Sequence, residues 1–142
     1  MLYFAYGSNM SSRRLQERVP TARAIGIGFV EGRRLAFHKL GSDGSGKCDI
    51  PESDDPSDRV HGVLYEIPEE GWGSLDRAEG EGSHYHRVLM RVSRPNESDL
   101  EAWVYLADPK KIRAGLKPTA EYRQHVLDGV REHSVPGNWH DL

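Results

Sequence analysis

One carboxylate stands at a position where its charge is poorly stabilised, the end of a predicted helix. The segment LDRAEG (75–80) places Glu79 in the last helical turn, directly before the helix terminator Gly80. The negative end of the helix dipole opposes ionisation there, and burial would raise the pKa of Glu79 further. A carboxyl group with a raised pKa is suited to carry a proton at neutral pH. The alternative is an ordinary exposed glutamate, because the dipole penalty on a surface stays below about 1 kcal/mol.

A second candidate for chemistry is the segment YGSNM (6–10), which follows a short aromatic stretch. Its small residues allow the main chain to turn tightly, so that successive N–H groups point at one spot. A helix that starts just after them adds its positive end to the same spot. Such a group of amides suits a carboxylate or a developing oxyanion. The alternative is a plain strand-to-helix turn, with Ser8, Asn9 or Ser11 as the helix cap.

The segment 41–48 gives little support for a phosphate-binding or calcium-binding loop. The segment GSDGSGKC (41–48) nearly matches a phosphate-binding loop, but Cys48 replaces the hydroxyl residue that holds magnesium. The Asp-Ile-Pro sequence that follows cannot begin the helix such a loop requires. Lys47 also occupies a position where a calcium loop needs oxygen. Nucleotide hydrolysis and calcium binding are therefore disfavoured, and Cys48 is expected to be a small buried residue.

Metal and hydrolase sites find little support. His84 and His86 are spaced to share one face of a strand, but no third zinc ligand is evident. Ser8 lacks the G-x-S-x-G context of a hydrolase nucleophile. We expect no metal and no other cofactor. The arginine pairs at 13–14 and 33–34 are expected to be solvated, and the three tryptophans to lie in the core or an interface.

The elements that must position these residues can be outlined from hydrophobic periodicity and turn residues. A short helix over 11–20 ends at Pro20. The remaining pattern predicts strands 2–6, 23–30 and 33–39, a long loop 42–59 with one short strand near Cys48–Ile50, strand 60–67, helix 68–80, strands 84–93 and 100–107, and helix 119–133. Because strands and helices do not alternate regularly, an α+β fold with a curled, partly closed sheet is favoured over a doubly wound one.

Composition narrows the class of protein. The chain has 142 residues, enough for one core, and we expect a single domain over 1–142. The net charge of −3 and the pI of about 6.2 give no electrostatic sign of nucleic-acid binding. No apolar run reaches the roughly 20 residues that span a bilayer, and no secretory signal is evident. A single cysteine fits a reducing, cytoplasmic setting, and we expect a monomer or a homodimer.

YGSNM after an N-terminal strand, LDRAEG and then Tyr85 at the start of the next strand together resemble the γ-glutamylcyclotransferase-like family. The segments DGSGK and VHGVLYEI are similar to bacterial members. The resemblance runs from about Met1 to Val130, and the two motifs in this order form a fairly specific pair. It implies a small mixed, partly closed β-barrel flanked by about three helices, with a cavity at one end.

The resemblance also implies an activity and a set of site residues. The family releases 5-oxoproline from γ-glutamyl compounds. By resemblance, Glu79 is the catalytic glutamate and the binding loop acts largely through main-chain N–H groups. The substrate-binding positions that the resemblance implies are Tyr6, Gly7, Ser8, Asn9, Met10, Tyr85 and Tyr122. Relatives often have Leu where Met10 stands, a change that conserves volume.

The chemistry is internal aminolysis, in which the substrate's own α-amine attacks its γ-carbonyl. The enzyme then needs no nucleophile of its own, only orientation, donors for the oxyanion and one carboxyl group that moves a proton. Two alternatives stay open: removal of a γ-glutamyl protecting group from a biosynthetic amine, and a non-catalytic module that binds γ-glutamyl or other carboxylate ligands. The loop 42–59 is expected to contact the leaving amine. Because the shape of a loop does not follow from its sequence, the sequence does not specify which amine leaves.

Overall fold

The computed structural model describes residues 1–139 and contains a closed five-stranded barrel. Around the barrel the strands follow the order β1, β5, β2, β6, β7. The bounds are Leu2–Ala5 for β1, Arg23–Glu31 for β2, Arg59–Glu66 for β5, Tyr85–Arg94 for β6 and Glu97–Ala107 for β7. Neighbouring strands are antiparallel except β1 and β7, which pair in parallel and close the ring. The predicted small mixed barrel is therefore confirmed.

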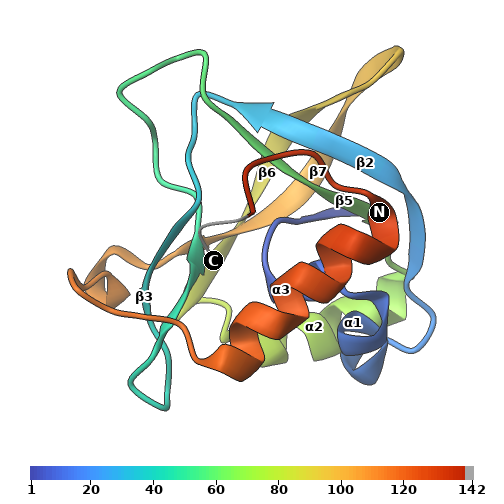
Figure 1. Ribbon diagram of the computed structural model, residues 1–142. Coiled ribbons are helices and arrows are strands. Elements are labelled where there is room, and N and C mark those ends of the chain that lie inside the picture. The colour runs from blue at the N-terminus through green and yellow to red at the C-terminus, as the bar shows by residue number, and fades with distance from the viewer. Residues whose placement is uncertain (140–142) are drawn as a thin grey trace.

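Two further strands form a hairpin outside the barrel. Strands β3 (Ala36–Leu40) and β4 (Gly46–Asp49) pair with each other as a two-stranded antiparallel sheet, and β3 makes one further bridge, from Lys39 to Ile112. A glycine is required at Gly46, because a Cβ there would lie 2.2 Å from the carbonyl oxygen of Phe37. Most of the predicted loop 42–59 is irregular, and its expected short strand is β4, slightly earlier than predicted. In Figure 1 the hairpin lies at the side of the barrel, and Phe37 and Cys48 contact Tyr122 of α3.

Three α-helices flank the barrel, as predicted. They are α1 (Ser12–Arg18), α2 (Trp72–Glu79) and α3 (Ala120–His133), with 3₁₀ turns η1 (Ser8–Met10), η2 (Glu69–Gly71) and η3 (Pro109–Lys111). Ser11 caps α1 and Thr119 caps α3 by accepting hydrogen bonds from main-chain N–H groups. Gly80 ends α2 in the left-handed conformation, with φ of 63°. In Figure 1, α1 and α2 lie side by side, and α3 packs against the turn η1.

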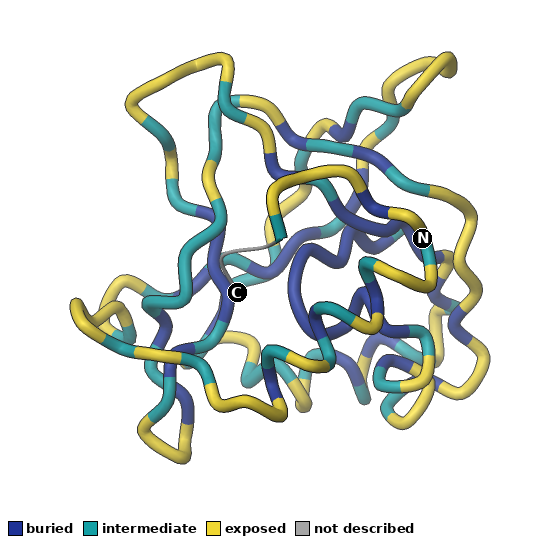
Figure 2. Tube along the Cα trace, in the orientation of Figure 1, coloured by how far each residue is buried: buried dark blue, intermediate teal, exposed yellow. Residues whose placement is uncertain are grey.

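The core lies inside the barrel and beneath the helices. Phe4, Val63, Leu64 and Tyr65 are fully buried where β1 pairs with β5. Gly62 permits this close pairing, since a Cβ there would lie 2.3 Å from the carbonyl oxygen of Ala5. Figure 2 shows the buried segments gathered at the centre and the exposed ones in the outer loops. The end of β1 and the turn η1 are among the buried segments, so the YGSNM segment is held rigidly by its surroundings.

The predicted element edges differ from the observed ones by a few residues. Strand 33–39 is shortened to Ala36–Leu40, and helix 68–80 is divided into η2 and α2. The predicted single-domain extent 1–142 includes residues 140–142, which lie outside the described residues. Within residues 1–139, none of the helices has the length and apolar character that a crossing of a lipid bilayer requires.

Candidate active site

A cavity of about 310 Å³ opens where the β1–α1 turn, the end of α2, the start of β6 and the β3–β4 hairpin meet. It collects residues from most of the length of the chain. Of the predicted site residues, those that line it are Tyr6, Gly7, Ser8, Asn9, Glu79, Tyr85 and Tyr122. The structure therefore brings together both sequence motifs, which are separated by about half of the chain.

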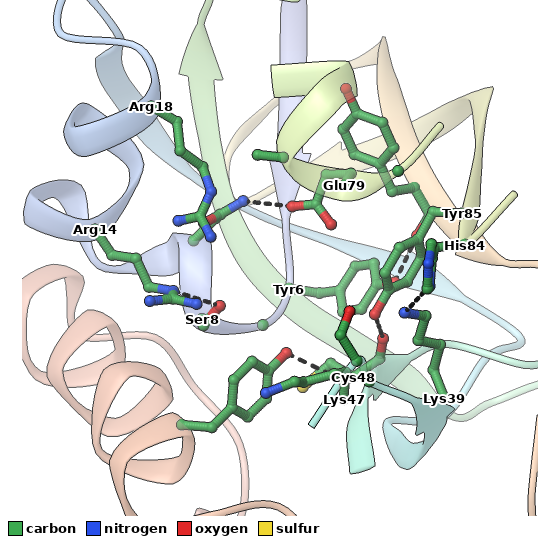
Figure 3. Close-up of a pocket in the computed structure, with 18 of the residues that line it drawn as sticks. Tyr6, Ser8, Arg14, Arg18, Lys39, Lys47, Cys48, Glu79, His84 and Tyr85 are labelled. Atoms are coloured by element: carbon green, nitrogen blue, oxygen red, sulfur yellow. Dashed lines mark hydrogen bonds between the residues drawn. The ribbon is translucent and has the colours of Figure 1, made fainter. Parts of the chain in front are cut away.

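Glu79 faces this cavity from the last turn of α2, next to the turn η1 (Figure 3). Asn9 Nδ2 donates a hydrogen bond to Glu79 Oε1 over 2.8 Å, and the same nitrogen donates to Tyr3 Oη over 3.1 Å. Burial raises the pKa of Glu79 above its ordinary value, although Arg18 and the hydrogen bond from Asn9 act in the opposite direction. The carboxyl group can therefore change its protonation state nearer to neutral pH than a free glutamate.

The turn after β1 presents main-chain donors to the same space. Met10 N–H donates to the carbonyl of Gly7 over 3.0 Å, which leaves the amides of Gly7, Ser8 and Asn9 without an acceptor inside the turn. Gly7 packs tightly against the hairpin, since a Cβ there would lie 3.0 Å from Cys48 Cβ. The Ser8 hydroxyl is already engaged, because Arg14 Nε donates to its oxygen over 3.0 Å. The hydrogen of the Ser8 hydroxyl can still be donated, so the turn offers this O–H as well as main-chain N–H groups.

Met10 differs from the other residues predicted to bind substrate. Its side chain is fully buried and does not line the cavity. Its carbonyl accepts a hydrogen bond from Tyr65 Oη over 2.8 Å, and α3 packs against it at Gly129. Met10 therefore anchors the turn against Tyr65 and α3, and its side chain does not face the cavity.

Buried tyrosines join the wall of the cavity to the hairpin. Tyr85 Oη donates to the carbonyl of Cys48 over 2.7 Å, and Cys48 N–H donates to Tyr122 Oη over 3.1 Å. Tyr6 Oη donates to the carbonyl of Tyr105. Burial raises the pKa of Tyr6, Tyr85 and Tyr122 well above the ordinary value, so all three hydroxyls stay protonated. The two bonds at Cys48 hold β4 in place as one wall of the cavity, whereas the bond from Tyr6 joins the end of β1 to β7.

The lining is strongly cationic, a property that the sequence analysis missed. Among the described residues around the cavity the only carboxylate is Glu79, whereas the cations are Arg14, Arg18, Lys39, Lys47 and Arg77. The prediction that Arg14 is solvated is wrong: it is partly buried and bound to Ser8. No local signal marks Lys39, because the register of β3 shifts between Ala36 and Lys39 and alternation along the strand does not apply there.

His84, His86 and Cys48 make their contacts within the protein. His84 Nδ1 lies 2.8 Å from Lys39 Nζ, whereas His86 Nε2 lies 2.7 Å from an oxygen of Asp108. Residues 1–139 contain no cluster of three side chains suited to hold a metal ion. Cys48 is buried, as expected, and burial raises the pKa of its thiol to about 12.

Comparison with known proteins places the chain in a family. The model of the AIG2-like family matches residues 59–141, more than half of the chain. Human γ-glutamylcyclotransferase is 27% identical over 141 residues, which cover 95% of this chain and 72% of the human protein. A solved structure described as a γ-glutamyl cyclotransferase is 25% identical and superimposes with a TM-score of 0.87, covering 96% of this chain and 81% of the other.

A further solved structure shows likeness of fold alone. YkqA from Bacillus subtilis is 21% identical and has a TM-score of 0.78, covering 94% of this chain and 49% of the other. The resemblance that the YGSNM and LDRAEG motifs indicated is confirmed by these findings. The chain belongs to the AIG2-like family and has the fold of the γ-glutamylcyclotransferases.

Proposed function

We propose that this protein is a γ-glutamyl cyclotransferase, which cleaves a γ-glutamyl amide by internal aminolysis and releases 5-oxoproline and a free amine. The observation that carries the proposal is the contact between Asn9 and Glu79 at the wall of the cavity. It places a carboxyl group with a raised pKa beside a turn of main-chain N–H donors. The relatives that carry this name support the same activity.

In the proposed complex the turn over 7–9 binds charge that the ligand carries or develops. The N–H groups of Gly7, Ser8 and Asn9 donate to the α-carboxylate of the glutamyl group or to the oxyanion of the tetrahedral intermediate. Arg14 lies beside Ser8 and adds positive charge on this side. The buried tyrosines support the hairpin wall opposite, so the ligand is held in a folded conformation with its amine near its own carbonyl.

Glu79 would carry the protons of the reaction. The substrate's α-ammonium loses two protons on becoming the lactam N–H, and the amide nitrogen gains two on leaving as an ammonium. The new bond joins the α-nitrogen to the γ-carbonyl carbon, and the bond that breaks joins that carbon to the leaving nitrogen. A single carboxyl group that alternates between its two forms can pass these protons, provided that both nitrogens approach it. The raised pKa of Glu79 suits this exchange near neutral pH.

The same geometry bears on the two alternatives. Removal of a γ-glutamyl protecting group would use the same residues with a different leaving amine. A non-catalytic module that binds a simple carboxylate ligand would gain nothing from Glu79, because a carboxylate beside the amides repels an anion. Catalysis is therefore the better account of this cavity.

The direct test is the release of 5-oxoproline. The purified protein would be incubated separately with γ-glutamyl dipeptides and with γ-glutamyl amides of simple amines, and 5-oxoproline measured by mass spectrometry. We expect release from at least one class and none from the Glu79→Gln variant. Binding without release would support the non-catalytic module, and release that persists in the variant would contradict the role of Glu79.

A further inference from the structure

Lys39 is a buried cation whose recorded partners are all uncharged. Lys39 is 4% exposed, and its side chain reaches the cavity from β3. Its Nζ lies 2.8 Å from His84 Nδ1 and 4.9 Å from the centre of the Tyr85 ring. No carboxylate oxygen of residues 1–139 lies within 4.0 Å of this nitrogen, so the nearest partners supply no compensating negative charge.

The surroundings of Lys39 disfavour the charged form of its side chain. Burial lowers the pKa of Lys39, and the nearby charges of Lys111 and Lys47 add to this effect, whereas Glu79 alone acts to raise it. Lys39 in turn lowers the pKa of His84, so the imidazole is neutral and accepts from the ammonium through Nδ1. A buried ammonium usually has an anionic partner. The open side of Lys39 is the cavity, so an anionic ligand group is the partner that the site lacks.

The position of Lys39 indicates which part of a ligand it would meet. Figure 3 shows Arg14 and Arg18 on one side of Glu79, on α1, and Lys39 with His84 on the other. Under the proposed function, both the attacking and the leaving nitrogen must lie near Glu79. If the glutamyl carboxylate occupies the side of Ser8 and Arg14, the leaving amine extends toward the hairpin.

We propose that Lys39 is a specificity-determining residue that binds a carboxylate on the leaving amine. It thereby selects leaving amines that carry a carboxylate over neutral amines of the same size. This assignment rests on the proposed function and adds to it the residue that reads the leaving group. Lys47 is less suited to the task, because it already has a carboxylate partner, with Nζ 3.6 Å from an oxygen of Asp43. Lys39 has no such alternative partner among the described residues.

The test compares two substrates that differ only in charge. γ-Glutamylalanine carries a carboxylate on its leaving amine, and γ-glutamylalaninamide carries a neutral carboxamide in its place. The Lys39→Met variant keeps an apolar side chain of similar length in this buried position. We expect it to lower kcat/KM for γ-glutamylalanine by about 10- to 100-fold and for the amide by less than about threefold. The ratio of the two values is unaffected by any fraction of protein that fails to fold.

A matched control removes a nearby charge that does not line the cavity. Lys111→Gln takes one positive charge from the vicinity of Lys39 and is expected to change the ratio by less than about threefold. Equal losses on both substrates in Lys39→Met would overturn the assignment and leave the proposed function standing. Absence of 5-oxoproline from both substrates with the unmodified protein would instead overturn the proposed function, and the assignment with it.

Discussion

Asn9 and Glu79 are 70 positions apart in the chain, yet Nδ2 of the first lies 2.8 Å from Oε1 of the second. This bond links the turn after β1 to the end of α2. It also stabilises the ionised carboxylate, since the hydrogen bond from Asn9 lowers the pKa of Glu79 against the larger effect of burial. The protonation of Glu79 thus depends on two segments that only the folded barrel brings together.

Replacement of Glu79 by Gln should abolish turnover without loss of the fold. The amide keeps the size of the side chain but cannot carry a proton, and general acid–base groups contribute about 10²- to 10⁴-fold. We expect kcat for 5-oxoproline release to fall by about this factor, while calorimetry still detects ligand binding. The control is Glu81→Gln, which neutralises an exposed glutamate two positions away. Near-normal activity in Glu79→Gln would refute the assigned role.

The raised pKa of Glu79 also predicts how stability changes with pH. Between the ordinary value of 4.5 and the raised value, the folded protein holds a proton that the unfolded chain releases. Stability therefore falls as pH rises through this range. Glu79→Gln should be more stable than the parent protein at pH 7 to 8, and the difference should vanish below pH 4.5. Thermal unfolding followed by circular dichroism across this pH range measures it, and a constant difference at every pH would contradict the prediction.

The acid side of the activity profile should reflect the same group. If Glu79 accepts the proton of the α-ammonium, its ionised form is needed in the free enzyme, so kcat/KM falls as pH is lowered through its pKa. Because that pKa is raised, the fall should begin above the ordinary value of 4.5. Initial rates in buffers of constant ionic strength give this profile. An activity that is maintained down to pH 4.5 would exclude Glu79 as the base.

Ser8→Ala should have a much smaller effect than Glu79→Gln. The Ser8 hydroxyl accepts a hydrogen bond from Arg14, and the turn contributes to the site through its main-chain N–H groups. Loss of the hydroxyl releases the Arg14 side chain but leaves these amides in place. We expect kcat/KM to fall by less than about tenfold. A loss as large as that of Glu79→Gln would show that the hydroxyl itself takes part in catalysis.

Close contact between α3 and the turn η1 makes Gly129 sensitive to substitution. A Cβ at Gly129 would lie 2.5 Å from the backbone carbon of Met10, so Gly129→Ala must separate the helix from the turn. We expect a loss of about 1–3 kcal/mol in the free energy of unfolding, with reduced activity. Gly73→Ala in α2 is the control: its Cβ would meet only a flexible Arg77 atom at 3.5 Å, and it should gain about 0.5–1 kcal/mol. Equal stability of the two variants would contradict this packing.

The two motifs of the site could be predicted from the sequence because each is local. Gly80 marks the end of α2 and so fixes Glu79 in the last turn, and the small residues after β1 mark the turn η1. A curled, partly closed sheet could be anticipated from short strands without regular helical crossovers, and the resemblance to a known family implied the barrel. These features depend on turn chemistry and periodicity, which act over a few residues.

The cationic lining could not be predicted in the same way. Arg18 and Lys39 reach the cavity only because α1 and the hairpin pack on opposite sides of it, an arrangement set by long-range contacts. The glycine- and serine-rich composition around Gly46 indicated a loop, although a glycine there is what allows β4 to approach β3. Met10 is the last residue of the YGSNM motif, yet tertiary packing buries its side chain and places it against α3.

The hairpin β3–β4 takes no part in the ring of main-chain hydrogen bonds that closes the barrel. Its fixed points are a few polar contacts, among them those from Tyr85 and Tyr122 to the backbone of Cys48. The exposed turn over 42–44 at the tip of the hairpin can therefore change without opening the barrel, whereas Lys39, Cys48 and Asp49 in its strands are buried. Under the proposed assignments, recognition of the leaving amine by Lys39 and proton transfer by Glu79 lie in separate parts of the chain, which would let natural selection or an engineer change the accepted compounds while keeping the same chemical step.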